Sequence, residues 1–116
     1  MSSGNSTLSQ AHARTVIDYS RLRSFTGDDI GAERDIIELY KTTAEQVLAR
    51  LATALNDPHA WSRECHSLKG ASINLGVLEL GRLAAEAEMT PPSLKTLNIL
   101  RSAYADLANE VEARDH

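Results

Sequence analysis

The chain has 116 residues, the length of a single domain. Its formal net charge is −4 and it carries no basic stripe to neutralise phosphates, so we expect no nucleic-acid partner. No run of about 18 apolar residues occurs, which predicts no membrane-spanning helix, and the single cysteine, Cys65, excludes an internal disulfide.

The first part of the chain differs in composition from the rest. Residues 1–15 are polar and are predicted to form a flexible tail, ahead of a helical domain over residues 16–114. The tail lacks the apolar core of a signal peptide, and one free cysteine fits a reducing compartment. We therefore expect a cytoplasmic protein.

Five helical segments are predicted from apolar periodicity and from the residues that cap or break helices. Aspartate and serine at the starts accept hydrogen bonds from the first free N–H groups, while glycine and proline end the segments. The segments run from about Asp18 to Thr26, from Asp28 or Asp29 to Leu55, from Pro58 to Leu75, from Val77 to Met89, and from Ser93 through Val111.

Leucine and alanine dominate the apolar content, which favours helix-on-helix packing over a sheet. The connections between the segments are short, so consecutive helices should be antiparallel neighbours. The predicted fold is all-α, an antiparallel up-down-up-down four-helix bundle with a short additional N-terminal helix.

The third segment has two distinct faces. Its predicted buried stripe steps by four and three residues: Trp61, Cys65, Leu68, Ser72 and Leu75. The residues predicted to face water are Arg63, His66, Lys69 or Gly70, and Ile73. Glycine inside a helix costs about 1 kcal/mol relative to alanine. A glycine one turn from an exposed histidine therefore suggests that something approaches the ring closely.

The stretch from His66 to Gly76 reads His-x-Leu-Lys-Gly-x-Ser-x-x-Leu-Gly and is followed by a leucine-rich helix. This pattern resembles the histidine-containing phosphotransfer (HPt) domains of bacterial phosphorelays. The likeness extends to about Glu88, and more loosely over residues 18–112. The resemblance implies a helical bundle that is a phosphoryl carrier rather than an enzyme with turnover. It also implies that His66 is phosphorylated on its ring and exchanges phosphoryl groups with aspartates of receiver domains.

The chemistry of the histidine and lysine suits this role. A histidine is partly neutral near neutral pH, so one ring nitrogen has a lone pair that can attack phosphorus. Lys69 lies one turn further on, where its ammonium can pair with phosphate oxygens. An ordinary solvated lysine is the alternative. His12, His59 and His116 have no such surroundings and are interpreted as plain surface residues.

A carboxylate is expected beside the histidine. His66 lies ten residues before Gly76 and Glu88 lies twelve after it, so the two come level in antiparallel helices. Glu88 is then placed to accept the second ring N–H and to hold the reactive tautomer, as a glutamate or glutamine does in similar domains. A solvated glutamate is the alternative.

A docking surface is expected around the histidine. Gly70 leaves the backbone bare for a partner's active-site loop, unless it is instead a close helix–helix contact. Arg63 and Ile73 would flank the ring, and Ile36 or Ile30 on the neighbouring helix would extend an apolar patch, unless these isoleucines belong to the core.

The sequence predicts no metal site and no cofactor of its own. Cys65 and His66 are adjacent and point about 100° apart on a helix, so they do not form a metal pair, and Cys65 is interpreted as a core residue. No ATP-binding motif is present. Magnesium is expected on the partner, which would be a receiver domain of a response regulator or a hybrid histidine kinase.

The sequence is compatible with three biological contexts for this chain. The chain is a stand-alone monomeric phosphotransfer protein, or the phosphoacceptor domain of a larger chemotaxis-type kinase, or a helical interaction module whose histidine is incidental.

Overall fold

A computed structural model describes residues 17–115 of the chain. Over these residues the chain folds into five helices: α2 (Tyr19–Thr26), α3 (Ile30–Ala52), α4 (Pro58–Leu75), α5 (Leu78–Glu88) and α6 (Leu94–Asp115). The predicted all-α class is therefore confirmed. The predicted flexible tail over residues 1–15, and with it His12, lies outside the described residues, as does His116.

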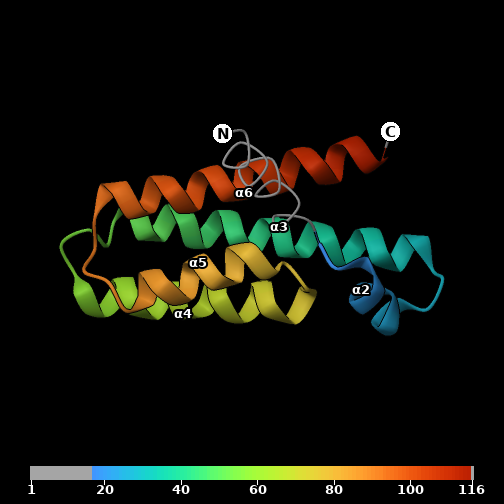
Figure 1. The fold of residues 1–116 in the computed structure, drawn as a ribbon, viewed down its shortest axis with the longest axis horizontal. Helices are drawn as coiled ribbons and strands as arrows, with labels where there is room; N and C mark the ends of the chain where they lie inside the picture. Colours follow the sequence, from blue (N-terminus) through green and yellow to red (C-terminus); the bar gives the residue numbers. More distant parts are fainter. Residues whose placement is uncertain (1–16, 116) are drawn as a thin grey trace, which may run out of the picture.

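The four longer helices lie side by side along the long dimension of the molecule, and consecutive helices run in opposite directions (Figure 1). Helix α4 packs against α3 and α5, and α6 packs against the same two helices. The short helix α2 lies at one end and contacts α3. Each of the four longer helices thus has two of the others as neighbours and buries one apolar face between them.

Four helices begin at residues that the sequence marks as caps. In each case a side-chain oxygen accepts a hydrogen bond from the backbone N–H three residues further on, which satisfies one of the free donors of the first turn. The capping residues are Asp18, Asp29, Asp57 and Ser93. Of the two candidates before α3, Asp29 is therefore the cap.

Helix α3 ends earlier than predicted. Its last residue is Ala52, whereas the sequence predicts an end near Leu55. Thr53 closes the helix, because its backbone N–H donates to the Arg50 carbonyl at 3.1 Å and its hydroxyl donates to the same carbonyl at 2.8 Å. These bonds tighten the last turn, and Ala54 then turns into the core.

The connection between α4 and α5 is tied to the start of α2. The Asp18 N–H donates to the Gly76 carbonyl at 2.9 Å, and the Arg21 Nε donates to the Asn74 carbonyl at 3.0 Å. Helix α2 therefore occupies carbonyl groups that the end of α4 would otherwise leave without partners.

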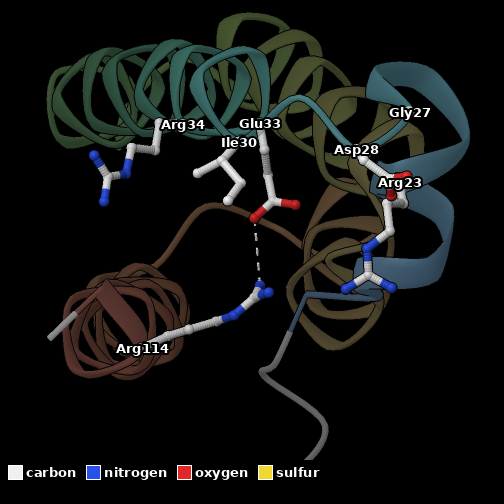
Figure 2. A pocket seen from close by; sticks show the side chains of 7 residues that line it. All are labelled: Arg23, Gly27, Asp28, Ile30, Glu33, Arg34 and Arg114. Carbon is white, nitrogen blue, oxygen red and sulfur yellow. Dashed lines mark ion pairs between the residues drawn. The ribbon is translucent and has the colours of Figure 1, made fainter.

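A polar pocket of about 400 Å³ lies where the α2–α3 corner meets the end of α6 (Figure 2). It is lined by Arg23, Gly27, Asp28, Ile30, Glu33, Arg34 and Arg114. Arg114 pairs with Glu33 at 3.6 Å across the pocket and stacks on the Tyr19 ring. No residue of α4 or α5 lines this pocket, so it is separate from the surface around His66.

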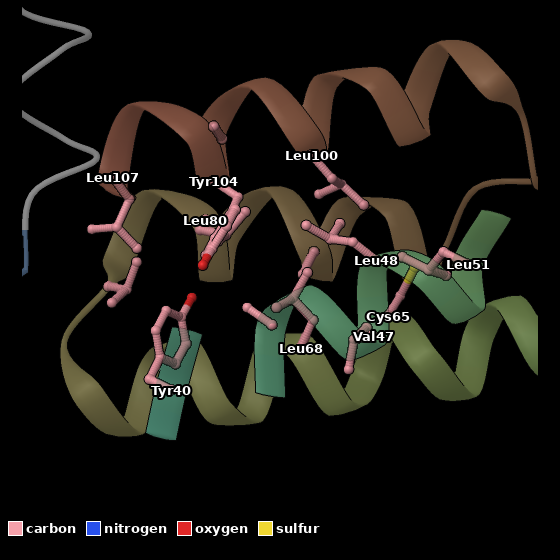
Figure 3. Close-up of a cluster of buried hydrophobic side chains, with 14 of the residues drawn as sticks. Tyr40, Val47, Leu48, Leu51, Cys65, Leu68, Leu80, Leu100, Tyr104 and Leu107 are labelled. Atoms are coloured by element: carbon pink, nitrogen blue, oxygen red, sulfur yellow. The ribbon is translucent and has the colours of Figure 1, made fainter. Parts of the chain in front are cut away.

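The core is a single cluster of leucine, alanine and a few larger side chains drawn from every described helix. Figure 3 shows the part of it between α3, α4, α5 and α6. Its buried polar groups are paired. The Tyr40 and Ser72 hydroxyls are 2.7 Å apart, and the Trp61 indole donates to the Ala87 carbonyl at 2.9 Å. Among the described residues, no buried side-chain nitrogen or oxygen lacks a partner. These hydrogen bonds therefore offset the desolvation cost that burial imposes on the polar groups.

Replacing Gly76 with alanine should destabilise the protein by about 1–3 kcal/mol, because Gly76 has φ +85° and an added Cβ would lie 2.8 Å from the Asp18 Cβ. Urea unfolding measures the change. Gly70→Ala is the matched control. Its φ is helical and its Cβ would meet open space, so stability should rise by up to about 1 kcal/mol. Equal stabilities of the two variants would contradict the expectation.

Candidate functional site

His66 lies on the outward face of α4. Its side chain is 65% exposed, whereas the neighbouring Cys65 and Leu68 are fully buried. The helix buries one stripe against α3 and α5 and leaves the imidazole in solvent. The exposure follows from position on the helix alone, so the sequence was able to predict it.

Glu88, the last residue of α5, lies beside the ring. Its carboxylate oxygens are 3.1 and 3.3 Å from His66 Nδ1. The structure thus places the two residues level, as the count from Gly76 predicts. The Glu88 side chain is only 21% exposed, and its carboxylate contacts the ring on the Nδ1 side. A proton on Nδ1 leaves Nε2 as the nitrogen with a free lone pair.

Lys69 joins this pair from the next turn of α4. Its Nζ is 3.6 Å from Glu88 Oε1, and its side chain is 32% exposed. It is therefore held by the carboxylate rather than being an ordinary solvated lysine. His66, Lys69 and Glu88 form one cluster, which we call the histidine cluster. It combines a nucleophilic nitrogen with an ammonium group that can offset phosphate charge.

Gly70 is not a helix–helix contact. A Cβ added there would have no neighbouring atom within 4 Å. The glycine at the close contact between the two helices is Gly81 on α5, where an added Cβ would lie 2.8 Å from Ile73 Cγ1. The surface one turn beyond His66 is therefore open, and this openness is compatible with close approach of a partner.

The flanking residues divide into two groups. Arg63 is exposed and Ile73 is 43% exposed, so both lie on the surface. Of the two candidate isoleucines on α3, Ile36 is partly buried and lines a groove next to α4, whereas Ile30 lines the polar pocket between the α2–α3 corner and the end of α6. Only Ile36 lines this groove.

That groove has a volume of about 570 Å³ and lies between α2, α3 and α4. Its lining residues are Arg21, Phe25, Ile36, Leu39, Tyr40, Thr43, Ala71, Asn74 and Leu75. Ala71 follows Gly70 directly and lies about 7–8 Å along the helix axis from His66. This groove, which we call the α2–α3–α4 groove, adjoins α4 at Ala71, the residue after Gly70.

Sequence reasoning missed three exposed apolar side chains. Phe25 and Leu39 in the α2–α3–α4 groove are 61% and 67% exposed, and Met89 directly after Glu88 is 84% exposed. Leu39 lies off the buried stripe of α3, and this mismatch with the amphipathic pattern was the available signal. Phe25 lies one turn from the buried Leu22, so helical phase did not reveal its exposure. An apolar side chain that helical phase places in water marks a candidate contact surface.

Cys65 is buried directly beside the site. Burial, and secondarily the negative charges of Glu88 and Glu64, raise the pKa of its thiol to about 12. The thiol is thus an inert part of the core, as predicted. Within residues 17–115 no three histidine, cysteine, aspartate or glutamate side chains are grouped so that they could hold a metal ion.

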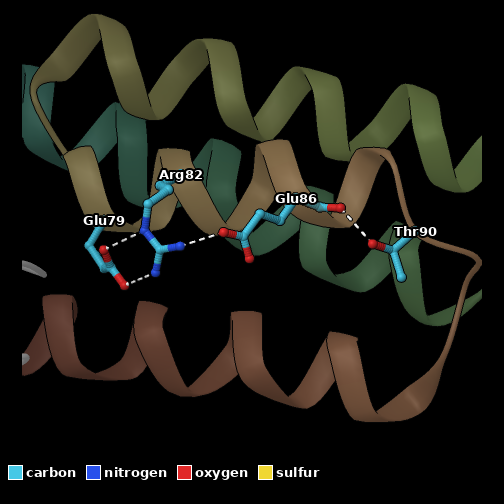
Figure 4. A network of polar contacts seen from close by, with 4 residues as sticks. All are labelled: Glu79, Arg82, Glu86 and Thr90. Atoms are coloured by element: carbon cyan, nitrogen blue, oxygen red, sulfur yellow. Dashed lines mark hydrogen bonds and ion pairs between the residues drawn. The ribbon is translucent and has the colours of Figure 1, made fainter.

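The other carboxylates of α5 are engaged away from the histidine. Arg82 donates to Glu79 at 3.0 and 2.6 Å and also pairs with Glu86, and the Thr90 hydroxyl donates to the Glu86 carbonyl at 2.7 Å (Figure 4). Helix α5 therefore presents Glu88 to the imidazole, while Glu79 and Glu86 pair with Arg82.

The structure combines a helical bundle with an exposed imidazole that contacts a carboxylate. This arrangement is typical of proteins in which a histidine side chain accepts a chemical group and passes it on. A family model described as the Hpt domain matches residues 35–114 of the chain, a range that contains the whole histidine cluster. The chain belongs to the Hpt-domain family. Members of this family are phosphotransfer modules of two-component signalling, have no kinase activity, and interact with receiver domains.

Neither the curated proteins nor the solved structures yielded a match to the chain. Over the described part of the chain, each helix is too short or too polar to cross a membrane.

At pH 8 the Cys65 thiol should react with a disulfide reagent at least about a hundredfold more slowly in the folded protein than in urea, since a rise in pKa from 9.0 to about 12 removes nearly all thiolate. The unfolded thiol ionises above pH 9 while the folded one does not, so the free energy of unfolding should fall as the pH rises from about 9 toward 12. Cys65→Ala should abolish this thiol-dependent part of the fall. Equal reactivity in both states would contradict the burial.

Proposed function

We propose that this protein relays phosphoryl groups between receiver-domain aspartates by way of His66, as a monomeric cytoplasmic phosphotransfer protein. The observation that carries the proposal is the contact of Glu88 with Nδ1 of a solvent-exposed imidazole. This contact selects the tautomer whose free lone pair is on Nε2. The frame is an up-down-up-down four-helix bundle in which α4 presents the ring.

In the proposed step, Nε2 of His66 attacks the phosphorus of a receiver's aspartyl phosphate in line. The Nε2–P bond forms as the P–O bond to the aspartate breaks, and the aspartate leaves as a carboxylate. The reverse step hands the group to a second receiver. Magnesium on the receiver offsets charge on the phosphoryl oxygens, and the ammonium of Lys69 is close enough to contribute a further positive charge.

The partner surface in this proposal is the open helix face at Gly70 together with the α2–α3–α4 groove. The groove is lined mainly by apolar side chains, is exposed at Phe25 and Leu39, and reaches α4 at Ala71, one residue after Gly70. A receiver that docks on it would bring its aspartate over Nε2. Binding energy from the groove would then hold the two reacting groups in line.

His66→Gln should abolish labelling by a phosphorylated receiver while changing the free energy of unfolding by no more than about 0.5 kcal/mol, because the ring is exposed. Transfer of radioactive phosphate and urea unfolding measure the two effects. His59→Gln, at an exposed histidine near the start of α4, is the matched control and should be labelled like the wild type. Labelling of the His66→Gln variant would refute the assignment.

Gly70→Gln should slow phosphoryl acceptance from a receiver by about tenfold or more, equivalent to about 1.4 kcal/mol, because a side chain at 70 occupies the open approach to the ring. The melting temperature should stay the same or rise, since glutamine is the better helix former. Acceptance from phosphoramidate, which needs no docking, should change far less. Equal slowing with both donors would argue against a docking role.

Comparing labelling by a receiver with labelling by phosphoramidate also tests the α2–α3–α4 groove. Leu39→Glu should weaken receiver-dependent labelling and spare labelling by phosphoramidate, because Leu39 is exposed and lines the groove. Ile99→Glu is the control, since Ile99 is a partly exposed isoleucine on α6, which does not line the groove. If the two variants behave alike, the groove is not the docking surface.

A further inference from the structure

We propose that Arg114, near the C-terminal end of α6, positions helix α2 and thereby determines how tightly a receiver domain binds in the α2–α3–α4 groove. This inference rests on the proposed function and adds a residue that lines the polar pocket and not the groove itself. Arg114 is a positioning residue, since it acts through α2 and not on the reacting atoms.

The Arg114 side chain joins three helices. Its guanidinium carbon lies 3.4 Å from the centre of the Tyr19 ring in α2, and its Nη1 lies 3.6 Å from Glu33 Oε1 in α3. Figure 2 shows the side chain reaching from α6 to Glu33. The aromatic face attracts the guanidinium, and the Glu33 side chain is 16% exposed, so salt screens the ion pair only in part. The end of α6 therefore holds the first turns of α2 and α3 together.

Helix α2 depends on contacts of this kind with the rest of the bundle. It has 8 residues, and isolated helices shorter than about 12–15 residues are marginal in water. Leu22 is its buried residue. Hydrogen bonds to the Gly76 and Asn74 carbonyls fix its start to the end of α4, and Arg114 fixes it to α6 and α3. Loss of the Arg114 contacts should therefore increase the fraction of molecules in which α2 is detached.

Helix α2 is also one wall of the α2–α3–α4 groove. Arg21 and Phe25 line the groove, and the Arg21 guanidinium carbon lies 5.8 Å from the centre of the Phe25 ring. A molecule in which α2 is detached lacks this wall, so a receiver binds well only to the fraction in which α2 is in place. The apparent dissociation constant rises by the inverse of that fraction. A saturating receiver restores α2, so the maximal rate of transfer should not change.

The test compares Arg114→Ala with the wild type in the full chain. Amide hydrogen exchange measures how often α2 opens, and exchange in α2 should be about tenfold faster while exchange in α4 and α5 is unchanged. Labelling at increasing concentrations of a phosphorylated receiver should show KM raised about threefold or more, with the maximal rate within about twofold of the wild type. Labelling by phosphoramidate, which needs no groove, should stay the same.

Three further variants serve as controls. Arg101→Ala removes the same charge from α6, but the Arg101 guanidinium donates to Asn98 of its own helix at 3.4 Å, so this variant should match the wild type. Tyr19→Phe keeps the ring face under Arg114 and should also match it. Arg114→Lys keeps a positive charge near Glu33 but lacks the planar group that stacks on the ring, so its KM should lie between those of the wild type and Arg114→Ala.

A wild-type KM in Arg114→Ala overturns the inference, whether or not exchange in α2 changes. Faster exchange in all helices, or equal slowing with receiver and phosphoramidate, also overturns it, because either result shows a general loss of stability instead of a displaced α2. Failure of the relay function has a different result. In that case no receiver labels the wild type, whereas failure of this inference alone leaves the wild type labelled.

Discussion

The register between helices α4 and α5 decides whether the exposed histidine has a carboxylate beside it. His66 and Glu88 are 22 residues apart and meet only because the two helices run antiparallel from a short connection at Gly76 and Val77. A slip of one residue would turn Glu88 by about 100° around the α5 axis. The carboxylate would then leave Nδ1, and the contact between the two side chains would be lost.

Contacts at both ends of the α4–α5 pair hold this register. Near the His66 level, the Trp61 indole donates to the Ala87 carbonyl, one residue before Glu88. Near the turn, Ile73 rests against Gly81, where a side chain would clash. Helix α4 therefore performs two tasks on opposite faces. Its buried, fully paired face fixes the position of the helix, and that fixed position gives the solvent-exposed face a defined geometry.

Local features of the sequence were sufficient to predict the five helices and the exposure of His66. Capping residues and apolar periodicity predicted the five helical segments, because caps and stripes depend on neighbours within about one turn. The same periodicity placed His66 off the buried stripe. The end of α3 was predicted three residues late. The Thr53 side chain closes the helix by donating to the Arg50 carbonyl, and apolar periodicity does not reveal such a hydrogen bond.

The tertiary structure alone decided which residues meet across helices. The sequence left open whether Gly70 was a helix contact, whether Lys69 was solvated, and whether Ile30 and Ile36 belonged to the core. Packing answers these questions: Gly70 faces open space, Lys69 is held by the Glu88 carboxylate, and Ile36 lines the groove. Each answer depends on the rotation and separation of two helices, which are set by the side chains of the whole core and not by the spacing of residues along one segment.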